Sequence, residues 1–113
     1  MRSPITTHIL DTHLGKPARG VPIQLRELRE GSFVDIASGR TDDDGRIADL
    51  LPPGTISPGV YQMRFDTAAY HCALGIQGFY PEVVVTFEVQ ASDEHYHIPL
   101  LLSPFAYSTY RGS

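Results

Sequence analysis

Histidines at three positions carry the side chains best suited to acid–base chemistry in this chain. His95 and His97 lie one residue apart in a segment that predicts a strand, so both side chains project from the same face of a sheet. His8 lies in another predicted strand, where it shares a face with Thr6 and Leu10. Imidazole ionises near neutral pH, so two histidines can supply an acid and a base without large pKa shifts. Each histidine taken alone is more typical of a structural or solvent-facing residue.

An acidic turn, TDDDGR, ends in Arg46, an arginine that could act beside these histidines. Asp side chains cap turns and Gly45 tolerates a positive φ, so the segment predicts a tight turn directly before Arg46. There the planar guanidinium can be held rigidly and offered to carbonyl or carboxylate oxygens. Taken alone, Arg46 is more typical of a surface arginine.

Metal binding is the alternative use of the same side chains. Three histidines could ligate zinc, but no cysteine or carboxylate stands at ligand spacing beside them. A calcium loop beginning at Asp42 needs glycine at its sixth position and glutamate at its twelfth, where this chain has Ile47 and Pro53. We therefore favour a site without metal.

Length and charge narrow the class of protein. The 113 residues, 42% of them apolar, predict one domain over residues 1–113. A formal charge of −4 and a single lysine, Lys16, argue against nucleic acid or an anionic membrane as partner. The opening MRSPITTHIL has no apolar run long enough for a signal peptide or membrane span, so we expect a cytoplasmic protein. Cys72, the sole cysteine, is expected to be a small buried hydrophobic residue rather than a nucleophile.

Apolar alternation and turn residues predict an all-β protein that would position these side chains. Alternating apolar segments are separated by Gly and Pro clusters, a pattern typical of a sandwich or barrel. One short helix is expected over residues 67–74, with Gly75 as its C-terminal stop. Eight strands are expected, at residues 5–11, 21–28, 33–39, 47–50, 60–65, 82–89, 95–102 and 106–110, and two facing four-stranded sheets would accommodate them.

Three segments together resemble one known family. They are THILDTHLGKPARGVPIQL from Thr7, TDDDGR from Thr41, and YHIPLLLSPFAYSTYRGS from Tyr96. The chain resembles the transthyretin-like family of 5-hydroxyisourate hydrolases along nearly its whole length. The terminal YRGS is the most specific piece, because in that family it distinguishes the hydrolases from the hormone-carrying transthyretins. The resemblance implies a transthyretin-like (prealbumin-like) sandwich.

The resemblance also implies a reaction and a set of site residues. The reaction is hydrolysis of the ring amide of 5-hydroxyisourate to 2-oxo-4-hydroxy-4-carboxy-5-ureidoimidazoline in urate breakdown, with no cofactor or metal. Which histidine is the general base stays open, and Ser113 would bring its hydroxyl and the α-carboxylate to orient a histidine or the arginine. The implied catalytic residues are His8, Arg46, His97 and Ser113, and the implied substrate-binding residues are these four with Tyr110, Arg111 and Gly112.

An assembly is implied as well. The family resemblance points to a homotetramer, a dimer of dimers with active sites at the dimer–dimer interface. A site completed by the last strand of a small sandwich would be shallow, and a second subunit could cover it. Residues 100–102 and 105–107 could supply such an interface or belong to the core.

Two other classes of function fit parts of the pattern. One is a transthyretin-like binding module that carries a small ligand without catalysis, for which His8, Arg46 and His97 would have no reason to converge. The other is a structural sandwich resembling carboxypeptidase regulatory-like domains, whose turn pattern is echoed by GKPARGVPIQL, TDDDGR and PPGTISPGVYQMRF.

Overall fold

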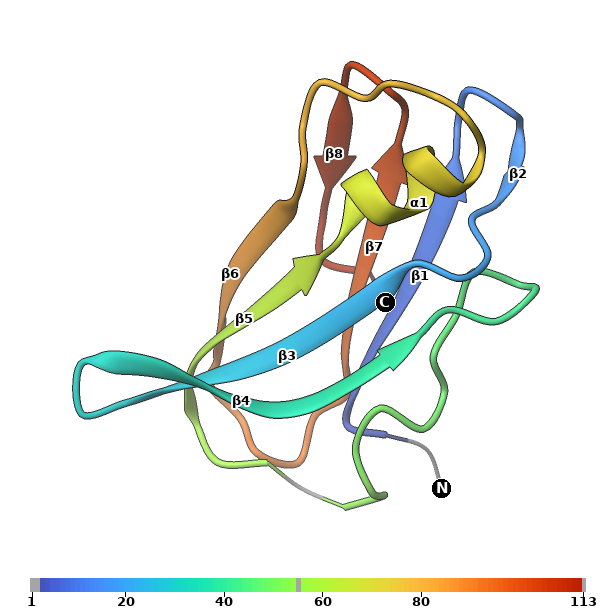
Figure 1. The fold of residues 1–113 in the computed structure, drawn as a ribbon. Coiled ribbons are helices and arrows are strands. Elements are labelled where there is room, and N and C mark those ends of the chain that lie inside the picture. Colours follow the sequence, from blue (N-terminus) through green and yellow to red (C-terminus); the bar gives the residue numbers. More distant parts are fainter. Residues whose placement is uncertain (1–2, 55, 113) are drawn as a thin grey trace.

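Two four-stranded sheets pack face to face in the computed structural model, which describes residues 3–54 and 56–112 (Figure 1). The first sheet has the order β2-β1-β7-β8 and the second the order β4-β3-β5-β6. The elements are β1 (Ile5–Asp11), β2 (Lys16–Pro17), β3 (Pro22–Arg29), β4 (Ser32–Arg40), β5 (Gly59–Phe65), α1 (Thr67–Ala73), β6 (Val83–Val89), β7 (Tyr96–Leu102) and β8 (Tyr107–Thr109). No helix within the described ranges is long and apolar enough to cross a membrane.

The first sheet depends on parallel pairing between β1 and β7, strands far apart in the sequence. The register sets Ile5 opposite Tyr96 and Asp11 opposite Leu102, so the two strands match along their full length. β2 and β8 then add antiparallel strands at the two edges. All neighbouring strands of the second sheet are antiparallel.

Side-chain alternation along β1 separates the core from the outer face of the first sheet. Ile5, Thr7 and Ile9 are buried, whereas Thr6 and His8 between them are only partly buried. The inward residues pack between the sheets with apolar side chains from β3, β5, β6 and β7. This alternation leaves the outer face able to carry polar side chains next to a rigid core.

Seven of the eight expected strands are present among the described residues, the one at residues 47–50 was wrong, and an unexpected strand, β2, brings the number there to eight. Residues 47–50 form no strand: Arg46 makes a single bridge to His8, and the chain then turns. Ile47 and Leu50 are buried, so these apolar residues anchor a loop to the core without pairing. The unexpected strand is β2, two residues at the edge of the first sheet, within one of the Gly and Pro clusters that were expected to separate strands.

The short helix is confirmed and ends one residue earlier than expected, at Ala73. Asp66 caps it, because its carboxylate accepts a hydrogen bond from the backbone N–H of Ala69 at 3.0 Å. Gly75 follows with φ of 71°, a conformation that favours glycine after a helix.

The expectation that Cys72 is buried was wrong, because the cysteine is exposed. Helix α1 instead turns its neighbour His71 into the core, where the side chain is 2% exposed. Neither ring nitrogen of His71 has a hydrogen-bond partner among the described residues. Burial lowers the pKa of His71 below its ordinary 6.5; the charge of nearby Asp11 opposes this shift and His13 adds to it. The fold thus holds a neutral imidazole in an apolar position.

Replacing His71 by Phe should stabilise the protein, most of all at acidic pH. The folded-state pKa is lowered, so the unfolded state binds the proton more readily and stability falls as the pH drops below about 6.5. An unsatisfied buried polar group costs about 1–3 kcal/mol, and the variant removes it. Urea unfolding at pH 8 and pH 5 measures both effects. An unchanged pH dependence in His71→Phe would contradict this account.

Candidate active site

The acidic turn positions Arg46 against the middle of β1. The Asp42 carboxylate accepts hydrogen bonds from the backbone N–H groups of Asp44 at 2.9 Å and Arg46 at 3.0 Å, which closes the turn as expected. The Gly45 carbonyl accepts a hydrogen bond from the Ile9 N–H at 2.8 Å, and Arg46 forms an antiparallel bridge with His8. The turn therefore docks on the strand as a local extension of the sheet.

Gly45 is required by this docking as well as by its conformation. Its φ is 74°, and a Cβ at this position would lie 2.4 Å from the Ile9 carbonyl oxygen. Any larger residue would push the turn away from β1. The glycine of TDDDGR thus brings Arg46 close to His8.

On the other side of β1, His97 of strand β7 and His95, which directly precedes that strand, both contact Thr6. The parallel register sets Thr6 opposite His97, and His95 lies on the same face two residues earlier. The Thr6 hydroxyl contacts His97 Nδ1 at 2.9 Å and His95 Nε2 at 3.0 Å. The shared face expected for the two histidines is therefore present, with a threonine between them.

After β8, Gly112 packs against His97. The Gly112 N–H donates to the His97 carbonyl at 2.9 Å, which forms an antiparallel bridge. A Cβ on Gly112 would lie 2.5 Å from His97 Cδ2 and 3.2 Å from Pro99 Cγ. The glycine of YRGS therefore lets the terminal segment lie directly against the imidazole.

A cavity of about 180 Å³ joins these groups on the outer side of the sheet. It is lined by Thr6, Thr7, Arg46, Ile47, Ala48, His95 and His97. Imidazole, hydroxyl and guanidinium groups thus surround a space suited to a small polar molecule. His8 lies on the same strand face as Thr6 and next to Arg46.

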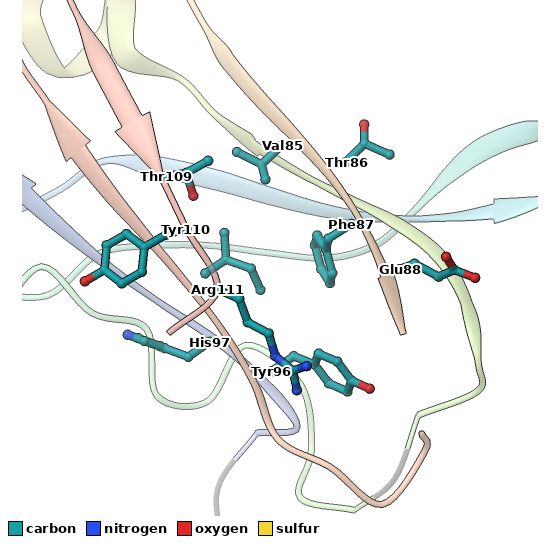
Figure 2. A pocket seen from close by; sticks show the side chains of 10 residues that line it. Val85, Thr86, Phe87, Glu88, Tyr96, His97, Thr109, Tyr110 and Arg111 are labelled. Carbon is teal, nitrogen blue, oxygen red and sulfur yellow. The ribbon is translucent and has the colours of Figure 1, made fainter. Parts of the chain in front are cut away.

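A second cavity, of about 260 Å³, lies where β6 faces β7, β8 and the residues after β8 (Figure 2). His97, Tyr110 and Arg111 contribute to its lining, so His97 takes part in both cavities. The Arg111 guanidinium contacts the Glu94 carboxylate at 3.2 Å and lies 4.7 Å from the centre of the Tyr96 ring. Figure 2 shows the Tyr110 and His97 rings extending to the same side, while Arg111 runs toward Tyr96.

The electrostatics favour a neutral His8. Burial is the largest cause of its lowered pKa, and the positive charge of Arg46 is the second. A hydrogen bond to the Asp44 backbone and the charges of Asp44 and Asp42 act in the opposite direction. A neutral imidazole next to a guanidinium can accept a proton while the cation holds an anionic or polarised group.

The structure brings together most of the residues expected from the sequence. Arg46 and His97 line one cavity, while Tyr110 and Arg111 line the neighbouring one. His8 and Gly112 line neither cavity; a backbone bridge joins His8 to Arg46, and another joins Gly112 to His97. Ser113 lies outside the described residues. Within the described ranges, no group of three or more His, Cys, Asp or Glu side chains is placed to hold a metal ion.

Thr6 is the member of the site that the sequence reasoning overlooked. The alternation of residues along β1 predicted only that Thr6 shares a face with His8. The signal was present in that alternation, but the partner strand was needed to show that the hydroxyl meets His95 and His97.

The fold and the site define a class of protein, a β-sandwich with a polar site on the outer face of one sheet. The groups of this site are suited to acid–base chemistry on a small molecule. The HIUase/Transthyretin family model matches residues 5–112. The 5-hydroxyisourate hydrolase of Salmonella typhimurium is 43% identical over 109 residues, covering 96% of this chain and 80% of the relative. The chain therefore belongs to the HIUase/Transthyretin family.

Solved structures agree with this assignment. Sea bream transthyretin in complex with thyroxine has a TM-score of 0.91 at 35% identity, covering 97% of this chain and 95% of that one. The Klebsiella pneumoniae 5-hydroxyisourate hydrolase has a TM-score of 0.81 at 33% identity, covering 96% and 92%. Overall shape is thus shared by a ligand-bound transthyretin and a hydrolase, so the site residues must distinguish the two functions.

Replacing Arg46 by Gln should raise the pKa of His8. The guanidinium disfavours the protonated imidazole, so its removal leaves the charges of Asp42 and Asp44 less opposed. A histidine NMR titration measures the shift, with Arg40→Gln as an exposed-arginine control. A His8 pKa that stays unchanged or falls in Arg46→Gln would contradict the assigned cause.

Replacing Gly112 by Ala should displace the His97 ring and leave the fold intact. The added methyl would approach Cδ2 to 2.5 Å, and Gly112 lies outside the named strands. The His97 ring resonances should shift while circular dichroism stays unchanged. The matched control is Gly39→Ala, where φ is not in the left-handed region and the added Cβ would meet only Ile47 side-chain atoms, at 3.4 Å or more. Unchanged His97 resonances in Gly112→Ala would refute the close packing.

Proposed function

We propose that this chain is a hydrolase that opens the ring amide of 5-hydroxyisourate to give 2-oxo-4-hydroxy-4-carboxy-5-ureidoimidazoline. The observation that carries the proposal is that Arg46 and His97 line one small polar cavity, with His8 bridged to Arg46 beside it. The 5-hydroxyisourate hydrolases among its relatives support the choice of substrate. We further propose that the reaction serves urate breakdown. A cytoplasmic location stays a prediction.

Hydrolysis of an amide needs a proton acceptor for water, stabilisation of an oxyanion, and a proton for the leaving nitrogen. His8 and His97 are the two imidazoles that can accept and donate these protons. Arg46 can hold and polarise the substrate carbonyls, since its guanidinium presents several N–H donors in one plane. Gly112 would keep His97 in place through the backbone bridge. Tyr110 and Arg111 would shape the neighbouring wall. A role for Ser113 is part of the same proposal.

We also propose a homotetramer, a dimer of dimers with active sites at the dimer–dimer interface. Tyr110, which lines the second cavity, is 59% exposed, so another subunit could cover it. Phe105 is 72% and Tyr107 42% exposed, which fits an interface role, whereas Leu100 and Leu102 belong to the core.

A binding module without catalysis is the competing function, because a transthyretin bound to thyroxine has the higher TM-score of the two structures compared. The polar site favours the hydrolase. A carrier of an aromatic ligand does not need two imidazoles and a guanidinium around one small cavity. The same consideration disfavours a purely structural sandwich.

Purified protein should accelerate the decay of 5-hydroxyisourate generated freshly from urate by urate oxidase, followed by absorbance. His8→Asn and His97→Asn should each lower turnover by on the order of 100-fold or more, the usual size of a general acid–base contribution. His13→Asn, at an exposed histidine outside the site, serves as the matched control.

Two results would count against the proposal. Decay no faster than the spontaneous background would exclude hydrolysis of this substrate. Full activity in both histidine variants would show that another site performs the reaction.

A further inference from the structure

The Thr6 hydroxyl lies between two imidazoles on the outer face of the first sheet. Its oxygen is 3.0 Å from His95 Nε2 and 2.9 Å from His97 Nδ1. A hydroxyl has one proton, so it can donate to only one of the two rings. At least one of these ring nitrogens must therefore carry a proton and donate it to Thr6. The protonation of each histidine is thereby linked to that of the other.

Strand geometry holds this arrangement firmly. Thr6 is paired with His97 across the parallel β1–β7 ladder, while Ile5 and Thr7 on either side are buried. The Thr7 hydroxyl donates to the Ile98 carbonyl at 2.6 Å and ties the two strands together beside the site. The hydroxyl between the histidines thus belongs to a sheet with its register set.

We propose that Thr6 is a positioning residue that makes His97 the general base and passes its proton to His95. This proposal rests on the proposed hydrolase function. In the resting arrangement His97 Nδ1–H donates to the Thr6 oxygen, and the Thr6 O–H donates to His95 Nε2. The nitrogen of His97 that acts on water is then Nε2.

The proton transfers balance as follows. Water gives a proton to His97 Nε2 while its oxygen forms a bond to the substrate carbonyl carbon. His97 Nδ1 then releases its proton to the Thr6 oxygen, and the original Thr6 proton moves to His95 Nε2. His97 becomes neutral with a proton on Nε2, and His95 carries the positive charge. The relay then runs back and returns a proton to His97 Nδ1 as His97 donates its Nε2 proton to the leaving nitrogen, so the ring never becomes anionic and the resting arrangement is restored.

Thr6→Val tests the hydroxyl, because valine keeps the branched shape and removes the oxygen. We expect kcat to fall by about 100-fold, at the lower end of general acid–base effects, with KM little changed. Thr6→Ser keeps a hydroxyl and should retain most of the activity. Equal loss in both variants would overturn the relay, because the methyl group would then matter and not the oxygen. Thermal unfolding of each variant checks that the sheet is intact.

His95 supplies the second arm of the test. His95→Asn should lower kcat, and adding it to Thr6→Val should cause little further loss, since both changes break the same path. Independent, multiplicative losses would overturn the proposal. Rates in mixtures of H₂O and D₂O should give a curved dependence for the natural protein and Thr6→Ser, reporting several protons in motion. A linear dependence in the natural protein would also count against the relay.

Histidine NMR separates failure of the relay from failure of the proposed function. The titrations of His95 and His97 should be coupled in the natural protein and uncoupled in Thr6→Val, whether or not the substrate is correctly chosen. Coupled titrations without hydrolysis would refute the hydrolase and retain the link through Thr6. Hydrolysis with uncoupled titrations in the natural protein would refute the relay and retain the hydrolase.

Discussion

Parallel pairing between β1 and β7 is the constraint on which the site depends. Its register directs Ile5 and Ile9 inward with Ile98 and Leu100, and leaves Thr6, His8 and His97 on the outer face. Because strand side chains alternate, a slip of one residue would expose the apolar set and bury the polar one. The free energy of core packing therefore also sets the positions of the acid–base groups, and the site needs no separate scaffold.

Two glycines complete the site from opposite edges of this strand pair. Gly45 lets the acidic turn approach the Ile9 carbonyl, and Gly112 lets the terminal segment lie on the His97 ring. In both places a Cβ would be 2.5 Å or closer to an existing atom, so the backbone itself forms the wall. The two sequence pieces that looked most specific, TDDDGR and YRGS, owe part of their role to the absence of a side chain.

The sandwich alone does not decide what the protein does, since transthyretin and hydrolase structures share it. The distinction lies in a few polar groups on one outer face, where burial and the charge of Arg46 keep His8 neutral. His71 shows the contrasting case of a fully buried imidazole, in the core and without hydrogen-bond partners in the described part of the chain. His71 makes the stability of the fold sensitive to acid and has no chemical role in the site. Environment, and not residue type, separates the two histidines.

Local pattern in the sequence was enough for the alternation of β1, the acidic turn, helix α1 and the shared face of His95 and His97, because each depends on neighbours a few residues away. It was insufficient for residues 47–50, where buried apolar side chains anchor a loop without a partner strand, and for Cys72, whose helix turns His71 inward instead. Nor could it place Thr6 between two histidines that lie about ninety positions further along the chain. Local patterns along the chain therefore indicate which side chains share a face. Which faces meet depends on the folded chain, because strand pairing and register are set by packing between distant segments.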